Sequence, residues 1–182
     1  MRIVSGTHKG RIITAPKSLP VRPTKDFAKE ALFNILNNAY YFSELSVLDL
    51  FSGTGNISYE FASRGSHTIR AVDAHYGCVK FISETAKNFD YPITAIKSDV
   101  YTYLSKHSEK ADIIFADPPY DFDEAKFAKI AELVFENGLL NPGGVLIIEH
   151  SKHSNLENAV RFTRSRKYGG SVFSFFENDL EE

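Results

Sequence analysis

From Leu45 to His150 the chain alternates short apolar runs with amphipathic segments, and this alternation restricts the fold more than any other feature. The apolar runs have the length of strands: "LSVLDLF", "TIRAVDA", "ITAIKSD", "ADIIFAD" and "GVLIIEH". Segments with apolar residues at helical spacing separate them, most clearly "DEAKFAKIAELVFEN". Uninterrupted apolar strands joined by helices are typical of a mostly parallel sheet covered on both faces. We therefore expect a doubly wound, Rossmann-like α/β fold.

The two ends of the chain depart from this pattern. "RIVSGTHKGRIITAP" predicts two short strands around a turn, and "RPTKDFAKEALFNIL" predicts a helix with Thr24 as its N-cap. "VRFTRSRKYGGSVFSFFEN" predicts an antiparallel hairpin that turns at two glycines. The expected organisation is an N-terminal β-hairpin and helix extension over residues 1–41, followed by a main domain over residues 42–182 whose parallel sheet ends in the hairpin.

Composition limits the class of protein. The single cysteine, Cys78, excludes a disulfide framework within the chain, and there is neither a signal-peptide-like start nor a run of 18 apolar residues. We therefore expect a cytoplasmic protein that contacts no membrane. The net charge is −2, yet residues 1–29 hold seven basic residues and one acid. A basic arm on an acidic body indicates contact with a nucleic acid, although a solvated terminal hairpin has the same composition.

The segment "VLDLFSGTGNIS" places glycines at the end of an apolar run. Ligands of open α/β sheets bind at the carboxyl ends of strands, and glycines let the backbone approach a ligand closely. A dinucleotide fingerprint would need a third glycine, where this chain has Ser58. Asp49 would also repel a pyrophosphate but attract an ammonium group. The loop therefore favours a cofactor with an amine over NAD or ATP.

Two further acids follow the next two apolar runs. Asp73 has the position of the acid that binds ribose hydroxyls in nucleotide-binding folds. Asp99 is placed to accept from an adenine amine, although an acid at a strand end also serves as a helix cap. One acid for an amine and one for a ribose predict S-adenosylmethionine. The candidate cofactor-binding residues are Asp49, Phe51, Gly53, Gly55, Asp73, Asp99 and Val100.

The run "ADIIF" ends in "ADPPY", where two prolines hold Asp117 and Pro118 extended. The Asp117 carboxylate and the Pro118 carbonyl can then accept the two hydrogens of one exocyclic amine, while Tyr120 offers a face on which a base stacks. Two acceptors localise the amine lone pair and stabilise the positive charge that develops as a methyl group is transferred. The candidate catalytic residues are Asp117, Pro118, Pro119 and Tyr120. Alone, the motif also fits a stiff loop.

With these motifs the chain resembles the bacterial 16S rRNA guanine-N2 methyltransferases. The likeness includes "MRIVSGTHKGR", "RPTKDFAKEALFNIL", "VLDLFSGTGNIS", "DIIFADPPY" and "KYGGSVFSFFE". It implies a class I methyltransferase that moves a methyl group from S-adenosylmethionine to the N2 amine of one guanine in 16S rRNA or the small ribosomal subunit. It also implies that the N-terminal extension contacts RNA, through Arg2, His8, Lys9, Arg11, Arg22, Lys25 and Lys29. Relatives often have arginine where this chain has Phe27 and Lys29.

Other functions fit the same motifs. Adenine-N6 methyltransferases of RNA or DNA and protein glutamine methyltransferases use similar sites, and an rRNA-binding assembly factor without activity would share the basic arm. Asp117 in place of asparagine disfavours the glutamine alternative, and the intact motifs disfavour a factor without activity. His150 and His153 are three residues apart, but no further ligands accompany them, so we expect a solvated loop there and no metal. We further expect a monomer.

Overall fold

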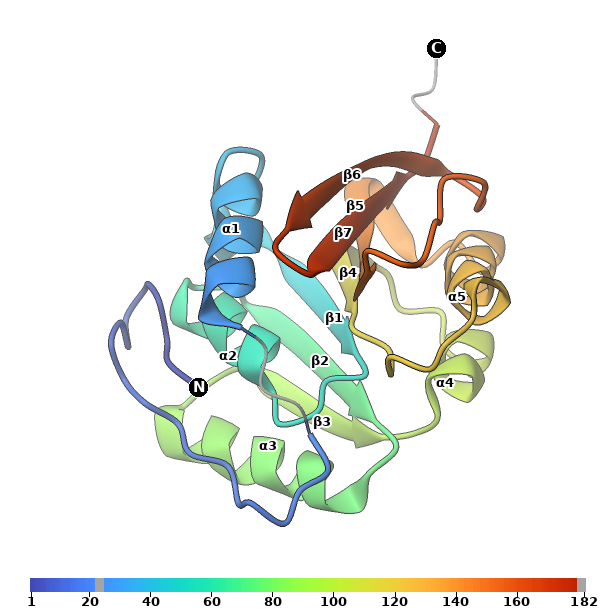
Figure 1. Cartoon of the computed structure of the whole chain (residues 1–182). Helices are drawn as coiled ribbons and strands as arrows, with labels where there is room; N and C mark the ends of the chain where they lie inside the picture. The colour runs from blue at the N-terminus through green and yellow to red at the C-terminus, as the bar shows by residue number, and fades with distance from the viewer. Residues whose placement is uncertain (22–24, 180–182) are drawn as a thin grey trace.

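A computed structural model describes residues 1–21 and 25–179, and within them the chain forms a seven-stranded sheet in the order β3-β2-β1-β4-β5-β7-β6 (Figure 1). The strands are β1 (Ser46–Leu50), β2 (Thr68–Asp73), β3 (Ile93–Lys97), β4 (Ala111–Ala116), β5 (Leu140–Ser151), β6 (Phe162–Tyr168) and β7 (Ser171–Glu177). The first five strands pair in parallel, whereas β7 lies antiparallel between β5 and β6. The predicted doubly wound sheet with its C-terminal hairpin is confirmed.

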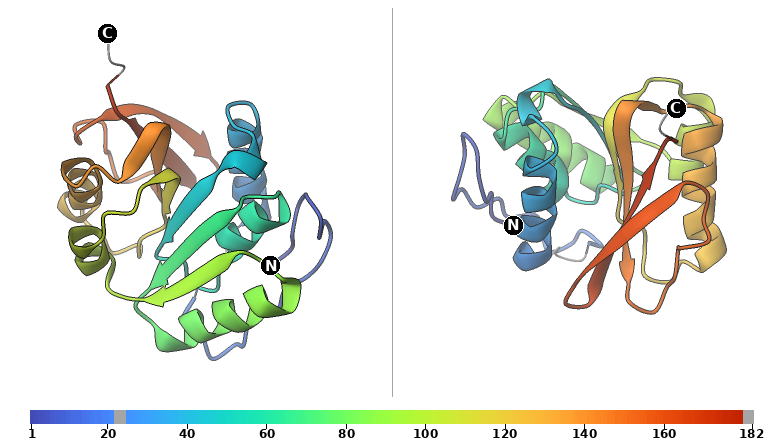
Figure 2. Two further views of the ribbon diagram at one scale, coloured as in Figure 1. Left: turned by 180° about the vertical axis from the view of Figure 1, so that it is seen from behind. Right: turned by 90° about the horizontal axis from the view of Figure 1, so that it is seen from above.

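Helices cover both faces of the sheet (Figure 2). They are α1 (Asp26–Asn37), α2 (Asn56–Ser63), α3 (Tyr76–Phe89), α4 (Val100–Lys106) and α5 (Glu124–Glu136), with a 3₁₀ turn, η1 (Phe42–Glu44), before β1. One core cluster packs strand residues such as Phe115 and Ile147 against α1, α2 and α3. The other packs their neighbours Ile114 and Ile148 against α4 and α5. The inner strands β1 and β4 and the second half of β5 are mostly apolar without alternation because both of their faces are buried.

The N-terminal segment folds onto the main domain and does not form the two predicted strands. Its only bridge within the described residues joins Arg2 to Ile12. The segment still turns back on itself as predicted, because Ile3 N–H donates to the Arg11 carbonyl (2.9 Å) and Ile13 N–H to the Met1 carbonyl (2.9 Å). The pairing stays this short because the turn between its two halves also bonds to α2, as where Thr7 N–H donates to the Ser63 carbonyl (2.8 Å). Ile3 and Ile13 belong to the same core cluster as α1 and α2. Thr24, the predicted N-cap, lies outside the described residues, and the domain boundary after residue 41 stays a prediction.

Candidate functional site

The strand ends and the N-terminal arm enclose one cavity of about 1190 Å³. Its wall contains nine of the residues predicted from the glycine loop, the two strand-end acids and the proline motif: Phe51, Gly53, Asp73, Asp99, Val100, Asp117, Pro118, Pro119 and Tyr120. Segments far apart in the sequence therefore form one site. Sequence reasoning missed the walls contributed by the arm, the linker and the start of α3, among them Met1, Ile12, Leu19, Val21, His75 and Cys78.

The loop after β1 has a left-handed backbone at three positions. The φ angles of Phe51, Gly53 and Gly55 are 54°, 55° and 91°. Gly55 directly precedes α2, and a Cβ atom there would lie 2.6 Å from the Tyr59 ring, so the position requires glycine. Gly53 N–H donates to an oxygen of Asp73 (2.8 Å). Asp73 thus fixes the shape of the glycine loop as well as lining the cavity.

Asp49 lies beneath the glycine loop and not in the cavity wall. Its side chain is 2% exposed, and one of its oxygens accepts a hydrogen bond from the Ser58 hydroxyl (2.6 Å). Burial raises the pKa of Asp49 to about 7, and the nearby charge of Asp73 acts in the same direction. Asp49 does not line the cavity, and its attraction to the ammonium group of a ligand stays a prediction. Gly55 likewise shapes the loop without lining the cavity.

The burial of Asp49 predicts a pH-dependent gain in stability for Asp49→Asn. The folded protein holds a proton that the unfolded chain, with a pKa of 3.8, releases. Between about pH 4 and pH 7 the wild type therefore loses about 1.4 kcal/mol of unfolding free energy per pH unit, a loss that the amide avoids. The stability of Asp49→Asn relative to wild type should rise across this window and then level off. Urea unfolding at each pH, with the exposed Asp121→Asn as baseline, measures this; parallel curves for Asp49→Asn and wild type would contradict it.

Asp99 and Val100 lie at the start of α4, where β3 ends. Asp99 caps this helix, because its carboxylate accepts from the backbone N–H of Thr102 (2.9 Å). Its side chain nevertheless lies in the cavity wall, as does Val100. Both readings of Asp99 from sequence, a helix cap and a polar group at the ligand site, are therefore compatible with the structure.

The proline motif separates the cavity from a narrow recess. Asp117, Pro118, Pro119 and Tyr120 line both spaces. On the far side, the recess is lined by Phe127, Glu149, His150, Ser151, Ser154 and Ser171. Asp117 N–H donates to the Leu50 carbonyl (3.4 Å), which extends the pairing of β4 with β1 by one residue. His150 is buried within β5, so the expectation that it lies in a solvated loop was wrong.

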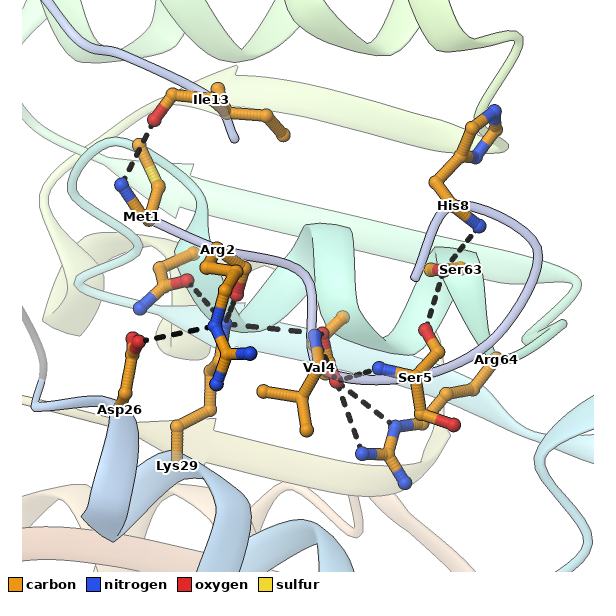
Figure 3. Close-up of polar contacts among 12 residues, drawn as sticks. Met1, Arg2, Val4, Ser5, His8, Ile13, Asp26, Lys29, Ser63 and Arg64 are labelled. Carbon is orange, nitrogen blue, oxygen red and sulfur yellow. Dashed lines mark hydrogen bonds and ion pairs between the residues drawn. The ribbon is translucent and has the colours of Figure 1, made fainter. Parts of the chain in front are cut away.

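A buried network attaches the arm to α1 and α2 (Figure 3). Lys29 is 1% exposed, and its ammonium group donates to the Arg2 carbonyl (2.5 Å) and to Asn56 Oδ1 (2.9 Å). Glu60 is fully buried, accepts from the backbone N–H groups of Val4 and Ser5 at 3.0–3.1 Å, and pairs with Arg64 and Lys29. The prediction that Lys29 contacts RNA is contradicted, because its charge is engaged inside the protein.

The other predicted RNA-binding residues differ in exposure. Arg2 is exposed, pairs with Asp26 at 3.5 Å and lines the cavity. Lys9, Arg11 and Lys25 are also exposed. His8 is half-buried, and its Nδ1 lies 2.9 Å from the Tyr91 hydroxyl. Arg22 lies outside the described residues. RNA binding by Arg2, His8, Lys9, Arg11, Arg22 and Lys25 stays a prediction.

No three His, Cys, Asp or Glu side chains of residues 1–21 and 25–179 are grouped as metal ligands would be. Among the helices of the same residues, none combines the length and apolar character that a membrane span requires.

Comparisons with known proteins concern the chain as a whole. A family model described as conserved hypothetical protein 95 matches residues 1–177. The chain is 31% identical to the putative rRNA methyltransferase YlbH of Bacillus subtilis, over 93% of this chain and 94% of that protein. It is 26% identical to ribosomal RNA small subunit methyltransferase D of Haemophilus influenzae, over 96% and 91% of the two chains.

A similar solved structure is the T. thermophilus 16S rRNA N2 methyltransferase RsmC in complex with AdoMet and guanosine. The TM-score is 0.68 and the identity 22%, over 87% of this chain and 45% of that one. At this identity the likeness concerns the fold alone. It confirms the expected doubly wound α/β fold.

Proposed function

The chain belongs to the conserved hypothetical protein 95 family, and from this membership we propose that it transfers a methyl group from S-adenosylmethionine to the N2 amine of a guanine in 16S rRNA. The observation that carries the proposal is the wall formed by Asp117, Pro118, Pro119 and Tyr120. It separates a cavity of cofactor size from a recess that holds polar groups. A methyl donor bound in the cavity can therefore reach an amine that is held at the edge of this wall.

The cavity suits S-adenosylmethionine. Ligand sites of proteins span roughly 300–1,000 Å³, so a cavity of about 1190 Å³ has room for the cofactor and part of a base. Asp73 offers its carboxylate to ribose hydroxyls and Asp99 to the adenine amine, while the backbone of the Phe51–Thr54 loop faces the remainder. When bound, the cofactor supplies a methyl group activated by the sulfonium charge.

The protein's own contribution to methyl transfer lies in Asp117 and Pro118. A guanine N2 amine is a weak nucleophile because its lone pair is delocalised into the ring. Acceptance of both amine hydrogens, by the Asp117 carboxylate and the Pro118 carbonyl, favours a pyramidal nitrogen and stabilises the charge that develops on it. The rigid backbone of two prolines fixes these acceptors before the base arrives. Tyr120, 66% exposed at the edge of the cavity, offers its ring for stacking.

The arm connects RNA binding to this pocket. Arg2 and Lys17 line the cavity, and Lys9 and Arg11 extend the positive charge along the same segment. RNA phosphates held by the arm would therefore place a neighbouring nucleotide at the mouth of the cavity. This placement favours an RNA substrate over a protein glutamine, which offers no phosphates.

The proposal is tested by methyl transfer in vitro and in cells. We expect radiolabelled S-adenosylmethionine to label 16S rRNA, naked or in small subunits, and not duplex DNA. Mass mapping of 16S rRNA from cells with and without the gene should show one guanine that loses an N2-methyl group. Label on adenine N6 would support the alternative enzyme, and unchanged 16S rRNA together with no label in any substrate would exclude the proposal.

A further inference from the structure

The recess behind the proline motif holds a second carboxyl group, Glu149, next to Asp117. Glu149 belongs to β5, is 6% exposed and lines the recess together with Asp117. In the pairing of β4 with β5, Ala116 stands opposite Ile148. The next residue of each strand, Asp117 and Glu149, therefore lies at the same level of the sheet and points to the same face. Two carboxyl groups thus face one small space.

The size of the recess decides which part of a ligand can enter it. Its volume is about 10 Å³, the space of a single water molecule. A base must therefore lie at the mouth of the recess, where Tyr120 is exposed, and only its hydrogen-bonding edge can face the two carboxyl groups. The recess can therefore accept hydrogen bonds from the edge of a base but cannot enclose the base ring.

His150, which also lines the recess, has both ring nitrogens engaged within the protein. Its Nε2 lies 2.7 Å from the Ser174 hydroxyl, and its Nδ1 lies 2.9 Å from the Ser151 carbonyl. Burial also lowers the pKa of His150, which favours the neutral ring. Glu149, which lines the recess beside Asp117, is placed to accept a hydrogen bond from the base atom next to the amine that Asp117 holds.

The three amino-bearing bases differ in the ring atom beside their amine. Guanine has N1–H, a donor, next to its N2 amine, whereas adenine and cytosine have a ring nitrogen that accepts. Neighbouring carboxyl groups resist ionising together unless donors face them. The edge of guanine presents three N–H donors in a row and relieves this repulsion. An adenine or cytosine edge presents a lone pair to the second carboxylate.

We propose that Glu149 selects guanine, by accepting the N1–H hydrogen bond while Asp117 and the Pro118 carbonyl hold the N2 amine. This inference rests on the proposed methyltransferase function and adds the residue that determines the base. Glu149 does not line the large cavity, so its role is separate from cofactor binding.

The test uses Glu149→Gln, with the exposed Glu136→Gln as a matched control. The loss of a charged acceptor should lower kcat/KM for 16S rRNA by about 10- to 100-fold. Guanosine should inhibit the wild type more strongly than 2-aminopurine riboside, which carries the same amine but no hydrogen on N1. In Glu149→Gln this preference should shrink, because the amide can donate to N1. Affinity for S-adenosylmethionine should match that of Glu136→Gln.

Three outcomes would overturn the inference. They are an unchanged kcat/KM, a nucleoside preference that survives in Glu149→Gln, and a loss of activity that accompanies lost cofactor affinity. If Glu149→Gln fails to fold, Glu149→Asp serves instead, because it keeps the carboxylate and should keep the preference for guanosine. Loss of this preference in Glu149→Asp would also count against the inference. A wild type that methylates no guanine refutes the proposed function itself, whereas guanine methylation with Glu149→Gln indistinguishable from wild type refutes this inference alone.

Discussion

Replacement of Asp117 by alanine is expected to lower the rate of methyl transfer to 16S rRNA by about 10³-fold, while S-adenosylmethionine still binds. In the proposed mechanism the carboxylate accepts a hydrogen of the target amine and stabilises charge that develops only in the transition state. The substitution should therefore lower kcat more than it changes KM. Asp117→Asn keeps one acceptor oxygen in place and should retain more activity than Asp117→Ala. Single-turnover kinetics with saturating cofactor measure the chemical step directly.

Asp121→Ala is the matched control for this prediction, because Asp121 is an exposed aspartate four residues further along that lines neither the cavity nor the recess. It should transfer methyl groups at the wild-type rate. A folded Asp117→Ala protein that no longer binds the cofactor would show that Asp117 has been given the wrong role. A methyl-transfer rate of Asp117→Ala close to that of the wild type would exclude the mechanism in which Asp117 accepts a hydrogen bond from the amine.

The fold was predictable from sequence because strands that are buried on both faces require runs of apolar residues, and such runs can be recognised in the sequence. Runs such as "IIFA" are apolar throughout, and β4 is covered on both faces. The arm pairs with itself at a single bridge instead of forming two full strands, because its turn also bonds to α2, which local sequence does not show. The family resemblance drawn from the motifs is confirmed by the family match over residues 1–177.

The site was predictable in its chemistry but less so in its geometry. Glycines and prolines fix backbone conformations locally, so Gly53 and the two prolines of the motif could be assigned to a pocket wall from sequence. The depth of a side chain depends on distant segments, and sequence reasoning therefore placed Asp49 and Lys29 at a ligand although both are buried. Glu149 escaped notice because it stands at the end of an apolar strand, where an acid gives no distinct pattern.

The second large effect is expected at Lys29, where methionine should destabilise the protein by about 3 kcal/mol. The substitution removes the buried cation that joins the Arg2 carbonyl, Asn56 and Glu60, and so leaves the Glu60 charge with less compensation (Figure 3). Arg64 still pairs with Glu60 at 3.0 Å. The expected loss of unfolding free energy is therefore near the lower end of the range for breaking a buried ion pair. Urea unfolding at neutral pH gives the difference.

The exposed pair Lys80–Glu84 provides the control, since Lys80→Met removes an equivalent ammonium group at the surface and should cost at most about 0.5 kcal/mol. A double-mutant cycle of Lys29→Met with Glu60→Gln should show a coupling of about 1–3 kcal/mol, because the two charges compensate each other. Hydrogen exchange should quicken first at the amides of Val4 and Ser5, which donate to Glu60. If Lys29→Met costs no more than Lys80→Met and the Val4 and Ser5 amides keep their protection, the buried network does not hold the arm. Faster exchange there, together with weaker cofactor binding, would instead show that the arm wall of the cavity depends on this one lysine.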